Sequence, residues 1–448
     1  CPFRLARASR QVFRWLRVMQ AVFGRLRLPT GSQNGYGTAM QDEQRADVII
    51  IGGGLIGLVQ ALALASHGIS CHIIDRADPA MMMADGFDGR TSAISSASYH
   101  MLEALGLGPA LSGKGYPIRQ IWVSDGLKPG AIDFVPSAED GFLGQMFENR
   151  ILRRAIYEAV AESPLVYLHM PRAITGKYRG ADGAHVTLDD GGVLHGDLMI
   201  VAEGRKSQTR EEAGINSAHW QYDHSAIVGA ITHERPHDGI AYEIFYPSGP
   251  FAILPMLDNA EGKHRSAIIW SHSGEDAAAY LKLSERAFAV ELEKAMGQIL
   301  GRVALAAPLS TYPLGFHHAA RITDERLALV GDSAHGIHPI AGQGLNLGFR
   351  DVAALTEILV DGVRLGLDLG DAQLMERYER WRSVDNLMVA FATDSLTRLF
   401  GIPGKTASAV RRFGMAMVQR TGPLKNFFMG EARGESGALP LLLKGQRI

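Results

Sequence analysis

The chain has 448 residues, enough for two or three domains or for one large α/β domain that carries a second sheet. Apolar residues make up 46% of it and charged residues 21%, which excludes a disordered or collagenous chain. With 45 Lys and Arg against 47 Asp and Glu, the net charge of −2 gives no reason to expect nucleic acid as a partner. Two distant cysteines, Cys1 and Cys71, exclude a CxxC redox pair, a cysteine-rich zinc site and an iron–sulfur cluster, so a reducing, cytoplasmic compartment is expected.

The first 39 residues differ in composition from the rest of the chain. They contain seven arginines and no acid, and the first five arginines recur every three or four residues, which in a helix forms a basic stripe. Three interpretations stay open: a translated extension upstream of a start at Met40, an organellar presequence, and an interfacial anchor.

A strand–turn–helix–strand unit is predicted directly after this extension. Residues 47–51 form a short apolar run rich in β-branched side chains, typical of a buried parallel strand. A helix is predicted over 55–66 and a second strand over 71–74. Strand and helix together explain the apolar stretch 48–65 better than a membrane span does, because a glycine triplet interrupts it.

The turn of this unit has the spacing of a dinucleotide-binding fingerprint, Gly52-x-Gly54-x-x-Gly57. Gly52 permits the tight turn, Gly54 lets a pyrophosphate approach the helix N-terminus, and Gly57 allows close packing of helix on strand. Asp75 ends the second strand, where its carboxylate can accept hydrogen bonds from a ribose. The fingerprint predicts a dinucleotide but does not distinguish NAD from FAD.

A second glycine-rich motif favours FAD. Residues 331–351 read GDSAHGIHPIAGQGLNLGFRD and follow the apolar strand 327–330. Asp332 at the strand end can bind a ribityl or ribose hydroxyl, and Pro339 stiffens the loop. A flavin ring that gains negative charge on reduction needs backbone N–H groups aimed at it, as at a helix start. The residues expected to provide this environment are Gly342, Gly344, Leu345 and Asn346.

With both motifs in place, the chain resembles the para-hydroxybenzoate-hydroxylase-like flavin monooxygenases and, among them, the ubiquinone-biosynthesis hydroxylases. The resemblance runs from about Ala46 to the C-terminus. Further segments that carry it are DGRTSAIS at 88–95, ENRILRRAI at 148–156, AEGRKSQTREEAGI at 202–215 and YPSGPFAILP at 246–255. It implies an enzyme that uses FAD, NAD(P)H as a transient reductant and O2 to hydroxylate the aromatic ring of a polyprenylated phenol or benzoquinol precursor in ubiquinone biosynthesis, by way of a flavin C4a-hydroperoxide.

The resemblance also implies cofactor contacts for two arginines and one acid. Arg90, in the D-x-R segment, and Arg150, in the N-R segment, are implied to lie along the flavin and pyrophosphate; surface or interdomain ion pairs are the alternative for both. Glu203 stands where the family usually has Asp. That segment is implied to serve both FAD and the nicotinamide, so the longer side chain is expected to affect flavin reduction more than FAD binding.

A substrate cavity is implied over the segment 246–255, whose sheet faces the flavin in this family. The aromatic residues expected to line it, with ordinary sheet core as the alternative for each, are Tyr242, Phe245, Tyr246 and Phe251. No side chain stands out as a general base. His335 and His338 lie three apart but have no third ligand nearby, so loop packing and no metal are expected.

The predicted fold is α/β, with a Rossmann-like FAD-binding domain, a second and mostly antiparallel sheet domain, and C-terminal helices. Strand-like runs in the second sheet are 120–124, 226–232, 241–246 and 266–271. The predicted regions are 1–39 for the extension, 40–115, 146–215 and 320–365 for FAD, 116–145 and 216–319 for the substrate, and 366–448 for the helices. Since a second GxGxxG is lacking, NAD(P)H is expected to bind transiently.

Alternatives stay open for location and activity. Residues 395–430 hold six basic residues and no acid among apolar side chains, which indicates either an amphipathic tail packed on the body or attraction to an anionic membrane surface. The expected location is cytoplasmic. Peripheral contact with the inner membrane surface, or with a quinone-biosynthesis complex, is the second interpretation. Alternative functions are hydroxylation of a small soluble phenol and a flavin-binding assembly subunit without turnover.

Overall fold

The computed structural model describes residues 43–84, 86–127, 132–137, 141–336, 343–383 and 418–448. The predicted extension 1–39, three loop residues and much of the basic tail lie outside these residues; the loop residues are Pro339, Gly342 and His338. Asp42–Ile448 forms one compact unit, and the account below concerns this unit alone.

A parallel sheet carries the predicted fingerprint. Strand β2 (Val48–Ile51) lies between β13 (Leu198–Val201) and β3 (Cys71–Ile74), all three parallel and fully buried. The sheet order is β20-β21-β13-β2-β3-β9, with β9 at Val166–His169, β21 at Leu327–Leu329 and the antiparallel β20 at Thr323–Asp324. Burial on both faces explains why these strands read as continuous apolar runs rather than alternating ones.

Helices and a second sheet cover the parallel sheet. Helix α2 (Leu55–Ala65) and helix α10 (Gln343–Arg364) share one hydrophobic core with it, and so do β11 (Gly183–Leu188) and β12 (Val193–Gly196). The last two belong to a sheet of order β1-β12-β11-β10, which the sequence did not predict; β1 is Glu43–Arg45 and β10 is Ile174–Gly180.

The second large sheet is mostly antiparallel, as predicted. Its order is β22-β19-β14-β17-β16-β15-β6-β7, with β18 also paired to β14. Among the described strands of this sheet, only the pair β6–β15 is parallel. Its strands are β6 (Gln120–Asp125), β7 (Ile132–Phe134), β14 (Ser217–His233), β15 (Ile240–Tyr246), β16 (Gly249–Met256), β17 (His264–Ser273), β18 (Val303–Leu305), β19 (Ser310–Ala319) and β22 (His335–Gly336). The four predicted strand runs fall within β6, β14, β15 and β17.

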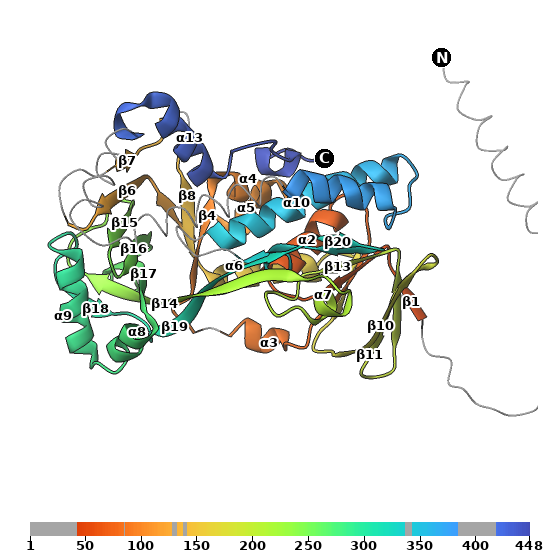
Figure 1. The fold of residues 1–448 in the computed structure, drawn as a ribbon, viewed down its shortest axis with the longest axis horizontal. Coiled ribbons are helices and arrows are strands. Elements are labelled where there is room, and N and C mark those ends of the chain that lie inside the picture. The colour runs from red at the N-terminus through yellow and green to blue at the C-terminus, as the bar shows by residue number, and fades with distance from the viewer. Residues whose placement is uncertain (1–42, 85, 128–131, 138–140, 337–342, 384–417) are drawn as a thin grey trace, which may run out of the picture. The chain divides into compact units, whose positions relative to one another are not determined.

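The two parts of the fold are joined by backbone pairing. The long strands β14 and β19 run from the large sheet toward the helices α2 and α10 (Figure 1). At the end of β19, His317 and His318 pair with Gly336 and His335 of β22, which belongs to the second glycine-rich motif. The predicted α/β fold class is therefore confirmed.

A small sheet lies between these parts. It has the order β4-β8-β5, with β4 at Thr91–Ser95, β5 at Tyr116–Ile118 and β8 at Gly144–Glu148. The predicted boundary at residue 146 falls inside β8, and the division into domains stays a prediction.

The remaining helices flank the sheets. Helices α8 (Gly274–Tyr280) and α9 (Glu285–Met296) cover one face of the large sheet. The others are α3 (Pro79–Met82), α4 (Ser96–Ala104), α5 (Gly108–Leu111), α6 (Asn149–Ala161), α7 (Gln208–Glu212), η1 (Gly331–Ser333), a helix over 372–383, α13 (Gly422–Arg433) and η3 (Leu441–Lys444). None of the helices in the described ranges has the length and apolarity needed to cross a bilayer.

Candidate functional site

The glycines of the fingerprint differ in what surrounds them. Gly52 has a φ of +110°, and a Cβ there would lie 2.4 Å from the carbonyl oxygen of Ala202. A Cβ on Gly57 would lie 1.9 Å from the carbonyl oxygen of Gly52. These positions require glycine, the first for its left-handed backbone and both for the close approach of strand, turn and helix. The steric roles predicted for Gly52 and Gly57 are confirmed.

Gly54 faces open space at the start of α2. A Cβ on it would meet nothing within 4 Å. It is the N-cap of α2, and no side chain caps the helix there. The first N–H groups of a helix lack intrahelical partners and carry the positive end of its dipole, so this end can hold an anion. The surroundings fit the pyrophosphate predicted for Gly54.

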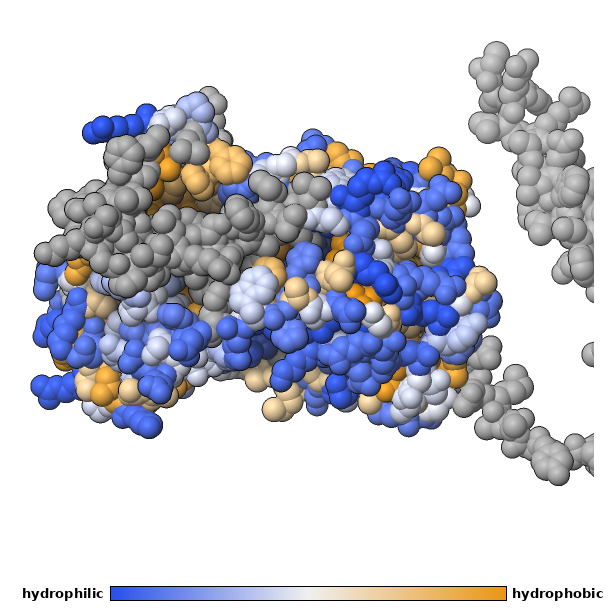
Figure 2. Space-filling view, in the orientation of Figure 1, coloured by the Kyte–Doolittle hydropathy of each residue, from blue (hydrophilic) through white to orange (hydrophobic). Residues whose placement is uncertain are grey.

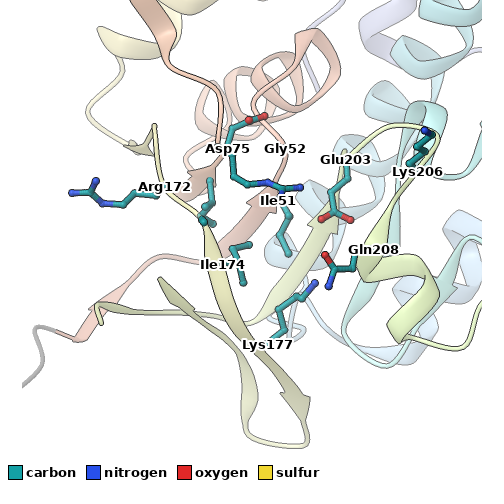
Figure 3. A pocket seen from close by; sticks show the side chains of 12 residues that line it. Ile51, Gly52, Asp75, Arg172, Ile174, Lys177, Glu203, Lys206 and Gln208 are labelled. Atoms are coloured by element: carbon teal, nitrogen blue, oxygen red, sulfur yellow. The ribbon is translucent and has the colours of Figure 1, made fainter. Parts of the chain in front are cut away.

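Asp75 lies beside this turn, at the end of β3. Its Oδ2 accepts a hydrogen bond from the N–H of Gly53 at 2.6 Å, and its Oδ1 accepts one from Ala77 at 2.8 Å. It lines a pocket of about 200 Å³ at the carboxyl ends of β2, β3 and β13 (Figure 3). Ligands of open parallel sheets bind at this edge, so the adenosine half of a dinucleotide fits here.

Glu203 lines the same pocket from the end of β13. Its Oε2 accepts hydrogen bonds from the hydroxyl of Ser207 at 2.6 Å and from the N–H of Thr209 at 3.0 Å. Glu203 therefore holds the start of the short helix α7. The side chain of Asp, which the family usually has at this position, is one methylene shorter. Lys177 approaches from β10 on the other side of the pocket (Figure 3), where its Nζ bonds the Thr209 hydroxyl at 3.0 Å.

A buried arginine connects this segment to the second motif. Arg210 is 4% exposed, and its NH1 group donates hydrogen bonds to the carbonyl oxygens of Arg205 and Ser333, each at 3.1 Å. The same group lies 3.1 Å from Nε2 of His317. Burial, and then the charges of Arg210 and Arg205, lower the pKa of His317 to about 4, so the neutral ring accepts this hydrogen bond. The sequence had given Arg210 no role.

The base of the second motif is held by a buried carboxylate, Asp351 of α10. It accepts hydrogen bonds from the N–H of Gly331 at 2.9 Å, from Nε2 of His335 at 2.6 Å and from Nε of Arg382 at 2.8 Å. Burial alone would raise the pKa of Asp351, but its bonds with His335 and Arg382 and the charges of these two groups hold the pKa below its usual range. His335 thus has the predicted packing role, while the sequence had missed Arg382.

Asp332 differs from Asp351 in having no such partners within the described ranges. Its side chain is exposed, yet the surrounding protein raises the pKa of its carboxyl group above the usual range, against the opposing charge of Arg205. Gly331, with a φ of +62°, makes the turn that separates Asp332 from β21. An acid that keeps its oxygens available at a strand end suits hydroxyl groups of a ligand.

Asn346, predicted as a flavin contact, is 3% exposed and binds the protein itself. Its Oδ1 accepts a hydrogen bond from the N–H of Ser95, and its Nδ2 donates to the carbonyl oxygen of Ala93, both at 2.9 Å. The side chain therefore fixes β4 to the start of α10. Gly344 faces open space one residue after the described helix begins, and Leu345 next to it is partly buried.

Replacing Asn346 by Leu should lower the free energy of unfolding by about 2 kcal/mol, because one buried and one partly buried backbone group lose their partners. Denaturant titration measures the loss, and hydrogen exchange at the Ser95 amide should become faster. Unchanged exchange at that amide would contradict the anchoring role of Asn346.

The two arginines predicted along the cofactor take part in ion pairs. Arg90 is exposed and donates from Nε to Asp88 at 2.8 Å. Arg150 donates from Nε to Glu148 at 2.6 Å, and the same carboxylate binds Arg265 of β17 at 3.0 Å. This is the arrangement that the sequence left open as the alternative, and the flavin contacts of both arginines stay predictions.

The predicted substrate-lining residues do not share one face of the large sheet. Phe245 belongs to the apolar cluster that includes Ala93 of β4 and Met146 of β8. The remaining three lie on the opposite face, under α8 and α9; they are Tyr242, Tyr246 and Phe251. The Tyr246 hydroxyl donates a hydrogen bond to the carbonyl oxygen of Ala295 in α9. Their position in a helix-covered core does not fit the lining role.

Comparison with known proteins agrees with this site. The family profile described as FAD binding domain matches residues 45–387. The Rhodospirillum rubrum protein named ubiquinone hydroxylase UbiL is 44% identical over 389 residues, which span 87% of this chain and 90% of that protein. The Escherichia coli protein named 3-demethoxyubiquinol 3-hydroxylase is 32% identical over 87% of this chain and 99% of its own length.

A solved structure agrees with the fold. The crystal structure of p-nitrophenol 4-monooxygenase PnpA from Pseudomonas putida superposes with a TM-score of 0.72 at 15% identity, over 88% of this chain and 100% of that one. The predictions of FAD as the cofactor and of a flavin-dependent monooxygenase are confirmed. The chain belongs to the FAD binding domain family and, within it, to the FAD-dependent ubiquinone-biosynthesis hydroxylases.

Proposed function

We propose that the protein hydroxylates the aromatic ring of a polyprenylated phenol or quinol precursor of ubiquinone, with NAD(P)H as electron donor and O2 as oxygen donor. The observation that carries this proposal is the 44% identity to the protein named ubiquinone hydroxylase, over 90% of that protein's length. The relative named 3-demethoxyubiquinol 3-hydroxylase, matched over 99% of its length, supports the same substrate class.

The described residues fit FAD at both of its ends. The N-terminus of α2 beside Gly54 would hold the pyrophosphate, and Asp75 would bind the adenosine ribose. Asp332 and the open start of α10 at Gly344 would hold the ribityl chain and the ring. When bound, FAD supplies the redox chemistry that accepts electrons from NAD(P)H and activates O2. The chain's own contribution is to orient ring and cofactor and to exclude water with the apolar cluster between β4, β8 and the large sheet.

The apolar character of the surface near α13 supports the proposal of an apolar substrate. Figure 2 shows apolar residues gathered where Figure 1 draws α13. Phe427 of α13 is 52% exposed and the same helix carries the basic Lys425, while Phe428 and Met429 pack against the apolar cluster. A helix that exposes an aromatic residue and carries a cation suits the interface of an anionic membrane, where a polyprenylated ring is available. Peripheral contact with the cytoplasmic face of the inner membrane, or with a quinone-biosynthesis complex, is part of this proposal.

Deleting the gene and identifying quinones by mass spectrometry tests the proposed function. The expected result is accumulation of a prenylated precursor that lacks one ring hydroxyl, reversed by the intact gene. Normal quinone without any accumulated precursor would overturn the proposal. Purified protein should then oxidise NAD(P)H faster with that precursor than with a small soluble phenol.

Replacing Asp332 by Asn should lower the FAD content of the purified protein without destabilising the apoprotein. The Asp332 side chain is exposed and has no hydrogen-bond or ion-pair partner among the described residues, so an amide of the same size should leave the stability of the apoprotein unchanged. The ratio of flavin to protein absorbance and the melting temperature of the apoprotein measure the two effects. A variant that retains its full yellow colour would contradict the cofactor role of Asp332.

A further inference from the structure

Glu243 of β15 is a buried acid that no site described so far uses. Its side chain is 8% exposed, and it has no hydrogen-bond or ion-pair partner among the residues that the structure describes. Buried polar groups are almost always partnered, because removing an unpaired carboxyl group from water destabilises the folded state. A side chain that only filled this position would be expected to be apolar.

The neighbours of Glu243 across the sheet are apolar. Its cross-strand partners are Val123 of β6 and Ala252 of β16, and Ile269 of β17 follows Ala252 in the same row. With no opposing charge from the residues that the structure describes, burial raises the pKa of Glu243 to about 7. The carboxyl group can therefore exchange a proton near neutral pH.

The face on which Glu243 stands is the one turned toward the cofactor motifs. Ala241 and Phe245, two residues away on either side, belong to the apolar cluster with Met146 of β8 and Ala93 of β4. Asn346 binds the backbone of that same β4 residue and thereby joins the cluster to the start of α10. Since residues at i and i+2 of a strand share a face, Glu243 points into this cluster and not toward α8 and α9.

A phenolic substrate has a hydrogen-bond donor, which the carboxylate of Glu243 lacks as a partner among the described residues. Its ring and prenyl chain match the apolar cluster, and its hydroxyl is a hydrogen-bond donor that an acid in apolar surroundings binds well. We propose that Glu243 accepts a hydrogen bond from the ring hydroxyl of the substrate and takes up its proton while the ring is hydroxylated. This inference rests on the proposed function and assigns the proton acceptor that the sequence left unknown.

The proton transfer is balanced within the reaction. The electron pair of the phenolic O–H bond stays on the ring oxygen and makes the ring carbon a better nucleophile. One oxygen of O2 forms the new C–O bond as a hydroxyl group, and the other leaves as water. The three hydrogens of these two groups come from the hydride of NAD(P)H, which carries the two electrons, from one solvent proton and from the attacked ring carbon. The hydrogen of the attacked carbon leaves as a proton, and Glu243 returns its own proton to the original hydroxyl.

Binding of a phenol and of its methyl ether tests the contact without turnover. The probes are 2-geranylphenol and 2-geranylanisole, titrated into the FAD-loaded protein. The wild type should bind the phenol about 10- to 100-fold more tightly than the ether, the range for a hydrogen bond to a charged group. In E243L this ratio should fall to about one, with ether affinity retained and a melting temperature no lower than that of the wild type. In E243Q an intermediate ratio is expected.

The matched control is E234Q. Glu234 lies just beyond β14 of the same sheet, is exposed, and binds Arg302. This variant should keep the wild-type ratio. The inference is overturned if the wild type shows no preference for the phenol, or if E243L keeps that preference. If the preference depends on Glu243 but the wild type hydroxylates no prenylated phenol, the contact stands and the proposed function fails.

Discussion

Replacing Gly57 by Ala should yield a protein that is at least about 3 kcal/mol less stable and is purified without FAD. The added Cβ would lie 1.9 Å from the carbonyl oxygen of Gly52, which is backbone and cannot move aside without shifting β2 and the turn. Denaturant titration gives the loss of stability, and absorbance of the purified protein gives its flavin content.

The matched control is Gly54→Ala in the same turn. A Cβ there meets nothing within 4 Å, so the apoprotein should lose no more than about 1 kcal/mol, the cost of an alanine at an N-cap. Flavin content should fall nonetheless, because the methyl group takes space next to the helix start that a pyrophosphate needs. Equal destabilisation by both substitutions would contradict the different roles of these glycines.

Replacing Asp351 by Asn should lower the free energy of unfolding by about 3–5 kcal/mol at neutral pH, the range for breaking a buried ion pair. Asp351 is fully buried, and the substitution removes the carboxylate on which the Arg382 and His335 side chains and the Gly331 amide converge. Because its pKa is lowered in the folded state, Asp351 stabilises the protein above the unfolded pKa of about 3.9. This contribution disappears as the pH falls through the folded pKa, so wild type and variant should converge in acid.

An ion pair between the same two helices provides the control. Asp361 of α10 and Arg377 of the helix 372–383 lie 3.4 Å apart, and both are more than 40% exposed. Asp361→Asn should therefore change stability by no more than about 1 kcal/mol. Similar losses of stability for both substitutions would contradict the prediction that burial makes the Asp351 ion pair the more stabilising of the two.

The features predicted correctly depend on signals that lie close together in the sequence. The strand β2, the glycine turn, the helix α2 and the strand β3 occupy fewer than thirty residues, and each has one physical reason. The sheet of β1, β12, β11 and β10 was missed because its strands are short and β1 pairs with a strand far along the chain. Arg382 was missed for a similar reason, since nothing in its helix distinguishes it from Arg377 or Arg380.

The predicted substrate-lining residues show where the sequence pattern stops being informative. Alternation along β15 separates Tyr242 and Tyr246 from Phe245 on opposite faces. Which face meets β4 and β8 depends on where α8 and α9 pack, and that is set by tertiary structure. Glu243 was overlooked for the same reason, because a single acid in a strand normally faces water.

The pairing of β22 with β19 makes part of the second glycine-rich motif the last strand of the large sheet. The described end of the second glycine-rich motif is thus fixed to the large sheet by backbone hydrogen bonds. A hinge between β19 and β22 would have to break these bonds, so His335 and Gly336 are expected to move together with the end of β19 as one unit.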